Sequence, residues 1–347
     1  MKKKVVAIIP AYKEQELETL PPLFQDLLDQ SYGLEKIILV DDASKDAIIS
    51  EIGKKHGVTV YRNSVSRMRA GAVNRGLAEL NEDIDFVLIL DADTRVKRDL
   101  VGRALSFFQR HPRCGGVCSI SGVLPIAKDA SLWKKYLWKM QHLEYEGFNQ
   151  TRTGTWKNVM VLHGMCTMFR RSVLEEVGRY TLDHLIEDYD LTIKIKKAGH
   201  LAMFNPEMKA WTVVPTSLEA LIAQRLRWLR GGIDVLLEHG ISRFTWEDAI
   251  NHVLFWLLLL AVIVVITSHI ILGNFTIKGV MWEPIALILA ILGYARSIWG
   301  LKYVEDLSWI DILIRISILP ELFWASIFTP VQIWAYILAL SKKKQSW

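Results

Sequence analysis

The 347-residue sequence has few of the residues that build disulfide or zinc frameworks, with three cysteines and nine histidines. Cys114 and Cys118 are four positions apart and Cys166 is isolated, and none has further Cys or His partners at the spacing of a metal site. We therefore expect three reduced thiols that act as small buried hydrophobes. A low and odd cysteine count favours a reducing compartment for the globular part.

The N-terminus lacks the long hydrophobic core of a signal peptide. Only five apolar residues, 5–9, stand between Lys4 and Pro10, which is too few for that role. This stretch predicts a buried first strand that ends at the proline. The globular part is then expected to stay in the cytoplasm.

The sequence also lacks a strong charge of one sign. Lys and Arg number 42 against 37 Asp and Glu, giving a formal net charge of +5. The basic residues are scattered, which argues against a nucleic-acid partner. A weakly basic surface suits anionic lipid headgroups or an anionic substrate.

Hydrophobic residues make up 51% of the chain and are spread unevenly. Residues 1–245 read as one globular domain, whereas residues 246–347 are mostly apolar. Residues 252–272 contain no Asp, Glu, Lys or Arg and are long enough to cross the ~30 Å hydrocarbon layer of a bilayer. Further spans are predicted at 284–301, which contains Arg296, and at 320–340. Residues 306–319, 130–150 and 216–238 mix apolar, aromatic and charged residues and predict helices that lie in the membrane interface. For 130–150, a surface helix docked on the globular domain is the alternative.

Three spans would place the tail Lys342, Lys343 and Lys344 outside the cell, against the positive-inside bias. Either the 306–319 segment forms part of a further crossing, or the bias does not hold here. The predicted location is the cell membrane, with several passes and a cytoplasmic catalytic domain.

Strand and helix patterns alternate through the first 110 residues. Strands are predicted at 5–9, 36–40, 58–61 and 86–90, and helices at 17–30, 45–56, 69–80 and 100–110. This alternation predicts an α/β fold with a mostly parallel, Rossmann-like sheet. Such sheets bind ligands beyond the carboxyl ends of their strands, where Tyr12, Asp42 and Asp93 fall.

Two acidic pairs follow predicted strands. Asp91 and Asp93, on either side of Ala92, would repel each other unless a cation lies between them, and a hard divalent ion with diphosphate oxygens would fill that need. A solvated acidic turn is the alternative. Asp42 can accept a hydrogen bond from the N3–H of uracil, and one residue of the Asp41–Asp42 pair can cap a helix instead.

Three further groups are candidates for the chemistry. Asp188, after Glu187 at a predicted helix start, can take a proton from an acceptor hydroxyl, although acids at helix starts are also common dipole partners. Arg69 begins a helix of small residues and can meet phosphate. His163 and Gly164 precede a predicted strand and either line an acceptor pocket or form a structural turn.

The pentapeptide from 224 to 228 is the most specific single pattern. Gln224, Arg227 and Trp228 stand at positions i, i+3 and i+4 of a predicted helix and therefore share a face. Arg227 can neutralise a diphosphate, and Trp228 can offer a flat face to a sugar ring. An amphipathic helix docked on the membrane is the alternative.

The ordered set of Pro10-Ala11-Tyr12-Lys13-Glu14, Asp42, Asp91-Ala92-Asp93, Glu187-Asp188 and Gln224-Arg225-Leu226-Arg227-Trp228 resembles the membrane-bound family 2 glycosyltransferases. These include cellulose, chitin, hyaluronan and poly-N-acetylglucosamine synthases, and the glucosylceramide synthases share the pattern. The resemblance spans about residues 4–240. It implies a GT-A fold, a nucleotide-diphosphate sugar donor, Mg²⁺ or Mn²⁺, and inversion at the anomeric carbon.

The resemblance also implies roles for single residues. Pro10, Ala11, Tyr12, Glu14 and Asp42 would line the nucleotide site. Asp91, Ala92 and Arg69 would lie on the donor side, and Asp93 would bind the metal. Asp188 would be the base, and Gln224 and Arg227 would hold the diphosphate. Trp228, Glu187, His163 and Gly164 would face the acceptor.

The sequence thus predicts a membrane-anchored, inverting, metal-dependent enzyme that transfers sugar from a UDP-sugar to a glycan or lipid-linked acceptor, with polysaccharide synthesis favoured. A single-transfer glycolipid synthase is the alternative. A membrane scaffold with an inactive nucleotide-sugar fold is disfavoured, because neither the metal nor the base carboxylate is missing. Whether the chain forms a homo-oligomer is left open.

Overall fold

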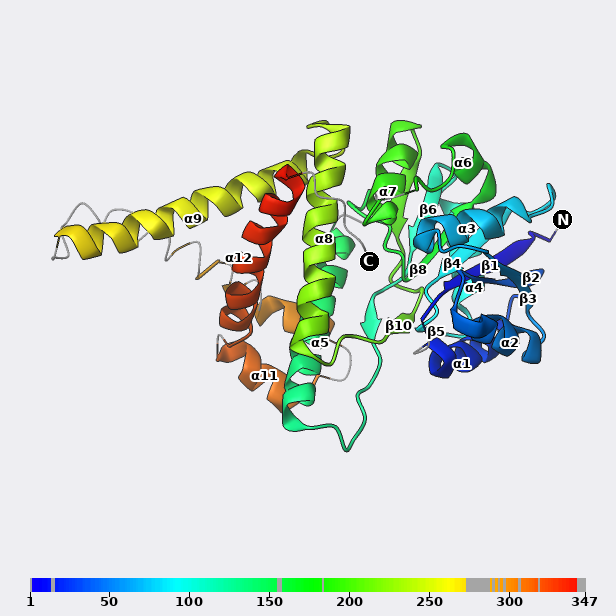
Figure 1. Ribbon diagram of the computed structural model, residues 1–347, viewed down its shortest axis with the longest axis horizontal. Helices are drawn as coiled ribbons and strands as arrows, with labels where there is room; N and C mark the ends of the chain where they lie inside the picture. Colours follow the sequence, from blue (N-terminus) through cyan, green and yellow to red (C-terminus); the bar gives the residue numbers. More distant parts are fainter. Residues whose placement is uncertain are drawn as a thin grey trace. The chain divides into compact units, whose positions relative to one another are not determined.

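A computed structural model describes residues 2–13, 16–154, 158–182, 184–272, 288, 291–292, 294–295, 298–304, 307–317 and 319–341 (Figure 1). The chain forms two compact units. The first contains Met1–Val235 and Val331–Trp347, and the second contains Leu236–Pro330. Each is described separately below.

The first unit is built on a seven-stranded sheet with strand order β3-β2-β1-β4-β8-β6-β9. Its strands are β1 (Val5–Ala11), β2 (Lys36–Asp41), β3 (Thr59–Arg62), β4 (Phe86–Leu90), β6 (Cys114–Cys118), β8 (Cys166–Arg170) and β9 (Leu201–Phe204). Strand β8 runs antiparallel to β4 and β6, and the other neighbours are parallel. The predicted mostly parallel α/β sheet is therefore confirmed.

A second, three-stranded sheet has the order β5-β10-β7. Its strands are β5 (Thr94–Val96), β7 (Gly122–Val123) and β10 (Ala210–Thr212). Strand β5 begins four residues after the end of β4, so the small sheet starts just beyond the carboxyl end of β4.

The large sheet is buried on both faces, and β1 shows why. All seven of its residues are buried. Val5, Ala7 and Ile9 belong to one core cluster, whereas Val6 and Ile8 belong to another, as expected from the two-residue repeat of a strand. Strands covered on both faces read as continuous apolar runs, which is the pattern of this sequence.

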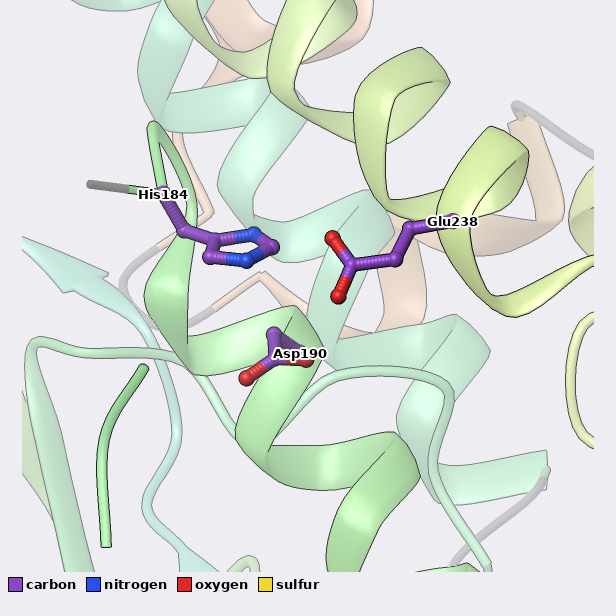
Figure 2. A group of neighbouring side chains, drawn as sticks. All are labelled: His184, Asp190 and Glu238. Atoms are coloured by element: carbon purple, nitrogen blue, oxygen red, sulfur yellow. The ribbon is translucent and has the colours of Figure 1, made fainter. Parts of the chain in front are cut away.

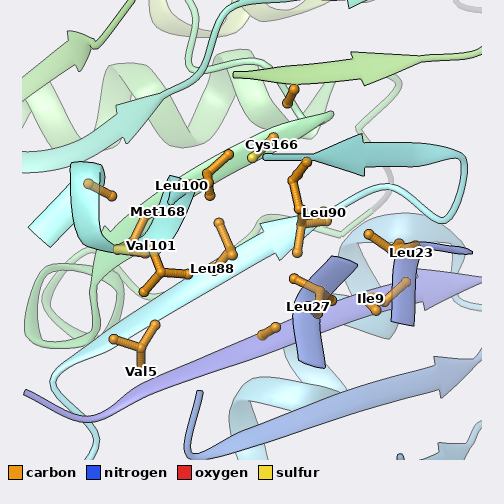
Figure 3. Packing of buried hydrophobic residues seen from close by; sticks show 14 of the residues in the cluster. Val5, Ile9, Leu23, Leu27, Leu88, Leu90, Leu100, Val101, Cys166 and Met168 are labelled. Atoms are coloured by element: carbon orange, nitrogen blue, oxygen red, sulfur yellow. The ribbon is translucent and has the colours of Figure 1, made fainter. Parts of the chain in front are cut away.

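Helices supply the two covers. Residues of α1 (Glu16–Leu28), α2 (Ile48–Lys55) and α4 (Leu100–Arg110) share the cluster of Val5 and Ile9, and Figure 3 shows Leu23 and Leu27 of α1 beside Ile9. Residues of α3 (Met68–Ala78), α6 (Arg171–Glu176) and α7 (Glu187–Lys197) share the opposite cluster. The result is a three-layer arrangement around the sheet.

Two predicted boundaries were wrong. Strand β1 does not end before Pro10 but continues to Ala11. The proline is tolerated because β1 pairs with β4 only over Val5–Ile8, so no ladder follows Pro10 on that side. The helix predicted over 45–56 is divided into a 3-10 turn (Lys45–Ala47) and α2, because Asp46 and Ala47 have left-handed backbone angles, with φ of 51° and 57°.

Two long helices complete the first unit. Helix α5 (Leu132–Gly154) and helix α8 (Leu218–His239) form where the sequence predicts the helices of 130–150 and 216–238. Ile233 of α8 packs with Ala335 and Ala339 of α12 (Leu319–Leu340). The C-terminal half of α12 is therefore part of the first unit.

The remaining predicted membrane elements are helical where they are described. Helix α9 (Trp246–Leu272) covers the first predicted span, and α11 (Trp309–Ile316) lies within the predicted interfacial segment. Among the described residues, one stretch, Leu322–Leu340, is long and apolar enough to cross a membrane. Half of the residues of the span predicted at 284–301, including Arg296, and the tail lysines lie outside the described residues.

The buried sheet predicts a strong position dependence of stability. Leu88→Ala in β4 removes a side chain with 0% exposure and is expected to lower the free energy of unfolding by about 2–5 kcal/mol. Leu28→Ala, where the leucine is 60% exposed, serves as the control and should cost far less. Thermal unfolding of both variants measures the difference, and equal losses would contradict the assignment of the core.

Candidate active site

Three carboxylates gather beyond the carboxyl ends of β1 and β4. Asp91 and Asp93 follow β4, and Glu16 begins α1 after β1. The Asp93 Oδ1 atom accepts a hydrogen bond from the Thr212 hydroxyl at 3.1 Å. Burial, with the nearby charges of Asp91 and Glu16, raises the pKa of Asp93 to about 7. The raised pKa reflects burial and the repulsion between these carboxylates, and a bound cation would relieve that repulsion.

Glu16 is a site residue that the sequence analysis missed. Its Oε2 atom accepts hydrogen bonds from the backbone N–H groups of Tyr12, at 2.6 Å, and Lys13, at 3.0 Å. Burial raises its pKa, and the Asp91 charge adds to the shift. In the sequence, the signal for Glu16 was its position at the start of a helix that follows a buried strand. The predicted nucleotide residue Glu14 lies outside the described residues.

The Arg69 guanidinium joins three distant parts of the chain. Its Nε lies 2.6 Å from Asp91 Oδ1, its Nη1 lies 2.8 Å from Glu187 Oε1, and its Nη2 donates to the Gly164 carbonyl at 2.6 Å. Charge-assisted bonds of this kind have fixed directions because the guanidinium is planar. Arg69 therefore sets the positions of the β4 end, the segment before β8 and the start of α7.

Asp188 lies in the first turn of α7, next to this network. Its Oδ2 atom accepts the Gly164 N–H at 2.9 Å, and its Oδ1 atom accepts the Tyr189 N–H at 2.9 Å. Burial and the Glu187 charge raise the pKa of Asp188 to about 6, although Arg69 and Arg227 oppose the rise. A half-buried carboxylate with this pKa can act as a base near neutral pH.

Gly164 connects Arg69 and Asp188 through its two backbone groups, since its carbonyl accepts from one and its N–H donates to the other. A Cβ atom at this position would lie 2.9 Å from Arg69 Cζ, so a larger residue would displace the guanidinium. The predicted site residues Asp91, Glu187, Gly164 and Asp188 are thus brought together around Arg69.

The start of α7 is fastened by a further aspartate. Asp190 has 1% exposure and accepts a hydrogen bond from the Thr181 hydroxyl at 2.6 Å. Figure 2 shows Asp190 on α7 and His184 in the segment before the helix. Glu238, also drawn there, comes after Val235 and belongs to the second unit, so it is not counted among the residues of this site.

Asp41 and Asp42 form hydrogen bonds with two different segments of the chain. Asp41 accepts from the Ser44 N–H and from the N–H and hydroxyl of Ser50. It bonds to the first turn of α2 from the end of β2 and is not the predicted helix N-cap, because the N-cap positions are Ser44 and Ala47. Asp42, with 3% exposure, accepts from the Asn63 amide, the Ser66 hydroxyl and the Arg67 N–H. Its carboxylate therefore orders the segment after β3, and a contact with uracil stays a prediction.

The other predicted nucleotide residues lie at the strand ends. Pro10 and Ala11 are buried within β1, whereas Tyr12 just beyond it is 52% exposed. The Ala92 carbonyl accepts from the Thr19 hydroxyl at 2.8 Å, which holds α1 against the turn after β4.

His163 is electrically neutral in this structure. Its Nε2 lies 2.8 Å from the Ser119 carbonyl and donates to it. Burial, with the neighbouring Arg152 charge, lowers the pKa of His163 to about 3. The residue therefore contributes a fixed neutral ring rather than a titrating group at neutral pH.

Helix α8 presents Gln224, Arg227 and Trp228, as predicted. Arg227 Nη1 donates to the Leu185 carbonyl at 3.4 Å, and its charge opposes the rise in the pKa of Asp188. Trp228 packs against a cluster of Val123, Tyr145 and Val214. The helix thus places a cation beside Asp188 and an aromatic ring beside the small sheet.

A pocket of about 480 Å³ opens near this aromatic cluster. It is lined by the segment around Leu124, the start of α5 with Lys134 and Trp138, and the segment after β10 with Val213. The predicted site residues do not line it.

Comparison with known proteins shows which family this chain resembles. The model of glycosyl transferase family 2 matches residues 6–178. The poly-beta-1,6-N-acetyl-D-glucosamine synthase of Staphylococcus epidermidis is 27% identical over 95% of this chain and 82% of its own length. The synthase of the same name from Staphylococcus aureus strain COL is 28% identical over 69% of this chain and 57% of its own.

A solved structure extends the likeness to the fold. The mannosyltransferase PcManGT of Pyrobaculum calidifontis, in complex with GDP-Man and Mn²⁺, covers 99% of this chain and 88% of its own with a TM-score of 0.66 and 18% identity. The predicted GT-A-like fold is thereby supported. The family match and the relatives together lead to one identification: the chain carries a glycosyl transferase family 2 domain over residues 6–178 and is a glycosyltransferase.

Proposed function

We propose that this protein transfers a sugar from a UDP-sugar to a growing glycan at the membrane, with inversion of the anomeric carbon. The observation that carries the proposal is the chain of contacts from Asp91 through Arg69 and Gly164 to Asp188. It joins an acidic cluster suited to a cation–diphosphate to a carboxylate suited to proton removal. The similarity to poly-N-acetylglucosamine synthases supports a polysaccharide product.

In the proposed reaction, Asp188 takes the proton from an acceptor hydroxyl while that oxygen attacks the anomeric carbon. The bond between the anomeric carbon and the diphosphate oxygen breaks, and UDP leaves with the bonding electrons. Attack on the side opposite the leaving group inverts the configuration. Arg227 and Gln224 are placed to hold the diphosphate, and Trp228 is placed to face the acceptor.

The acidic cluster fits a divalent cation, Mg²⁺ or Mn²⁺. Asp93 would hold it, since its carboxylate is the one whose protonation is most favoured by burial and by its neighbours. When bound, such an ion neutralises the negative charge that develops on the departing diphosphate. The protein's own part is to hold Asp93 against Thr212 and to keep Asp91 engaged with Arg69.

The products formed from labelled sugar donors distinguish a polysaccharide synthase from a glycolipid synthase. We would incubate purified protein with Mn²⁺ and radiolabelled UDP-N-acetylglucosamine, UDP-glucose or GDP-mannose in lipid vesicles. A ladder of water-soluble products from a UDP-sugar is the expected result. A single lipid-soluble product would favour the glycolipid synthase. Transfer from GDP-mannose alone would contradict the UDP assignment.

Asp188→Asn is expected to lower the rate of transfer by about 10²–10⁴-fold, because a positioned base contributes that much. The amide keeps the size of the side chain, so UDP binding should persist. In the wild type, the rate should fall below about pH 6 as Asp188 becomes protonated. Turnover at the wild-type rate in the variant would remove Asp188 from the role of base.

The affinity for Mn²⁺ should depend on pH through Asp93. The raised pKa means that Asp93 holds a proton below about pH 7, and a cation must displace it. The dissociation constant is therefore expected to rise about tenfold per pH unit below that value. Titration of Mn²⁺ by electron paramagnetic resonance between pH 5.5 and 8.5 measures this, with Asp93→Asn as the variant that should lose it. An affinity independent of pH would count against Asp93 as a ligand.

Gly164→Ala is expected to slow transfer by about 10²-fold, because its Cβ would push the Arg69 guanidinium away from Asp91 and Glu187. Gly147→Ala in α5 is the matched control, since a Cβ there meets no atom within 4 Å, and alanine favours a helix. Steady-state rates of the two variants test the arrangement. Equal rates would show that the position of Arg69 does not matter for transfer.

A further inference from the structure

We propose that Arg225 is a positioning residue that fixes the Gln224 amide and the Trp228 indole in the orientations that binding of donor and acceptor requires. The inference rests on the proposed function, because it concerns the same site. The sequence analysis assigned no role to Arg225, although it stands three positions before Trp228 and can therefore contact it on a helix.

The Arg225 side chain holds three neighbours at once. Its Nη1 donates to Gln224 Oε1 at 2.7 Å, and its Nη2 forms an ion pair with Glu144 of α5. Its Cζ atom lies 4.2 Å from the centre of the Trp228 ring. The residue is 1% exposed and is the largest of the fully buried side chains in the described part of the chain. Because the Arg225 guanidinium is planar, buried and bonded to these partners, it can adopt one arrangement.

The consequence for Gln224 is a defined amide orientation. A glutamine amide has one acceptor end and one donor end. Because Arg225 occupies the oxygen, the NH₂ group is the end left for other partners. Phosphate oxygens are acceptors, so a diphosphate requires the donor end. Without Arg225, the amide would be free to rotate and present its oxygen to an anion, which repels it.

The consequence for Trp228 is a fixed ring plane. A guanidinium over an indole face attracts it electrostatically, and more strongly when the pair is desolvated. The same ring packs on the Val123, Tyr145 and Val214 cluster. Glu144 anchors the guanidinium from α5, so the two helices together determine where the ring lies.

A merely structural pair between α5 and α8 is the competing explanation, and a double-mutant cycle separates the two. The variants are Arg225→Lys, Gln224→Ala and the double variant, with Mn²⁺ present. Arg225→Lys keeps the charge beside Glu144 but loses the fork and the flat face. It is expected to weaken UDP binding about tenfold by calorimetry in the wild-type background, and less than about twofold when Gln224 is already alanine.

The control is Arg230→Lys, which changes the other arginine of α8 with less than a tenth exposure in the first unit. It pairs with Asp234 at 3.5 Å, and its replacement should leave UDP affinity unchanged. Equal losses from Arg225→Lys in both backgrounds, or the same loss from Arg230→Lys, would overturn the positioning role.

A second variant keeps the test valid if Arg225→Lys does not fold. Glu144→Gln with Arg225→Met removes both charges, so neither is left unpaired in the interior. This protein should remain folded by size-exclusion chromatography and show the same tenfold loss. Full UDP affinity in it would reject the inference while leaving the proposed function intact. A wild type that neither binds UDP nor transfers sugar would instead contradict the proposed function, and this inference with it.

Discussion

The organisation of the site depends on one guanidinium. Arg69 bonds to Asp91 after β4, to Glu187 at the start of α7 and to the carbonyl of Gly164, whose N–H in turn holds Asp188. Arg69 and Glu187 are 118 positions apart in sequence. Without a cation here, the carboxylates would repel one another across the end of the sheet, and neither the acidic cluster nor Asp188 would have a fixed place.

The buried sheet makes this concentration of charge tolerable. Strands β1 and β4 are apolar along their whole length, and β2 is apolar between Lys36 and Asp41, so the acidic residues of this part of the sheet lie at the carboxyl ends of its strands. Burial there raises the pKa of Asp93 and Asp188 towards neutrality, which destabilises their charged forms. Groups with perturbed pKa values cluster at functional sites, and here Asp188 is bonded to the Arg69 network through Gly164, whereas Asp93 lies close enough to Asp91 to feel its charge.

Much of this arrangement was predictable from the sequence. The alternation of apolar strands and amphipathic helices predicted the parallel sheet, and the carboxyl-end rule placed Asp42, Asp91 and Asp93 at one edge. Helix periodicity placed Gln224, Arg227 and Trp228 on one face. Local patterns of this kind are set by neighbours in the chain.

The rest depends on contacts between distant segments, which no local pattern records. Glu16 reads as an ordinary acid at a helix start, yet it secures the turn after β1. Arg69 reads as a free cation for phosphate, yet its guanidinium is bonded to protein groups on three sides. Pro10 lies inside a strand because β4 ends beside it. The return of Ala335 and Ala339 to the first unit likewise follows from packing.

A structure of the protein determined with UDP and Mn²⁺ would test the central claim most directly. The account predicts that the ion lies against Asp93, that the diphosphate lies between it and Arg227, and that the Arg69 bonds to Asp91 and Gly164 remain intact with Asp188 facing the same space. An ion held elsewhere, with Asp188 facing away from the diphosphate, would contradict it.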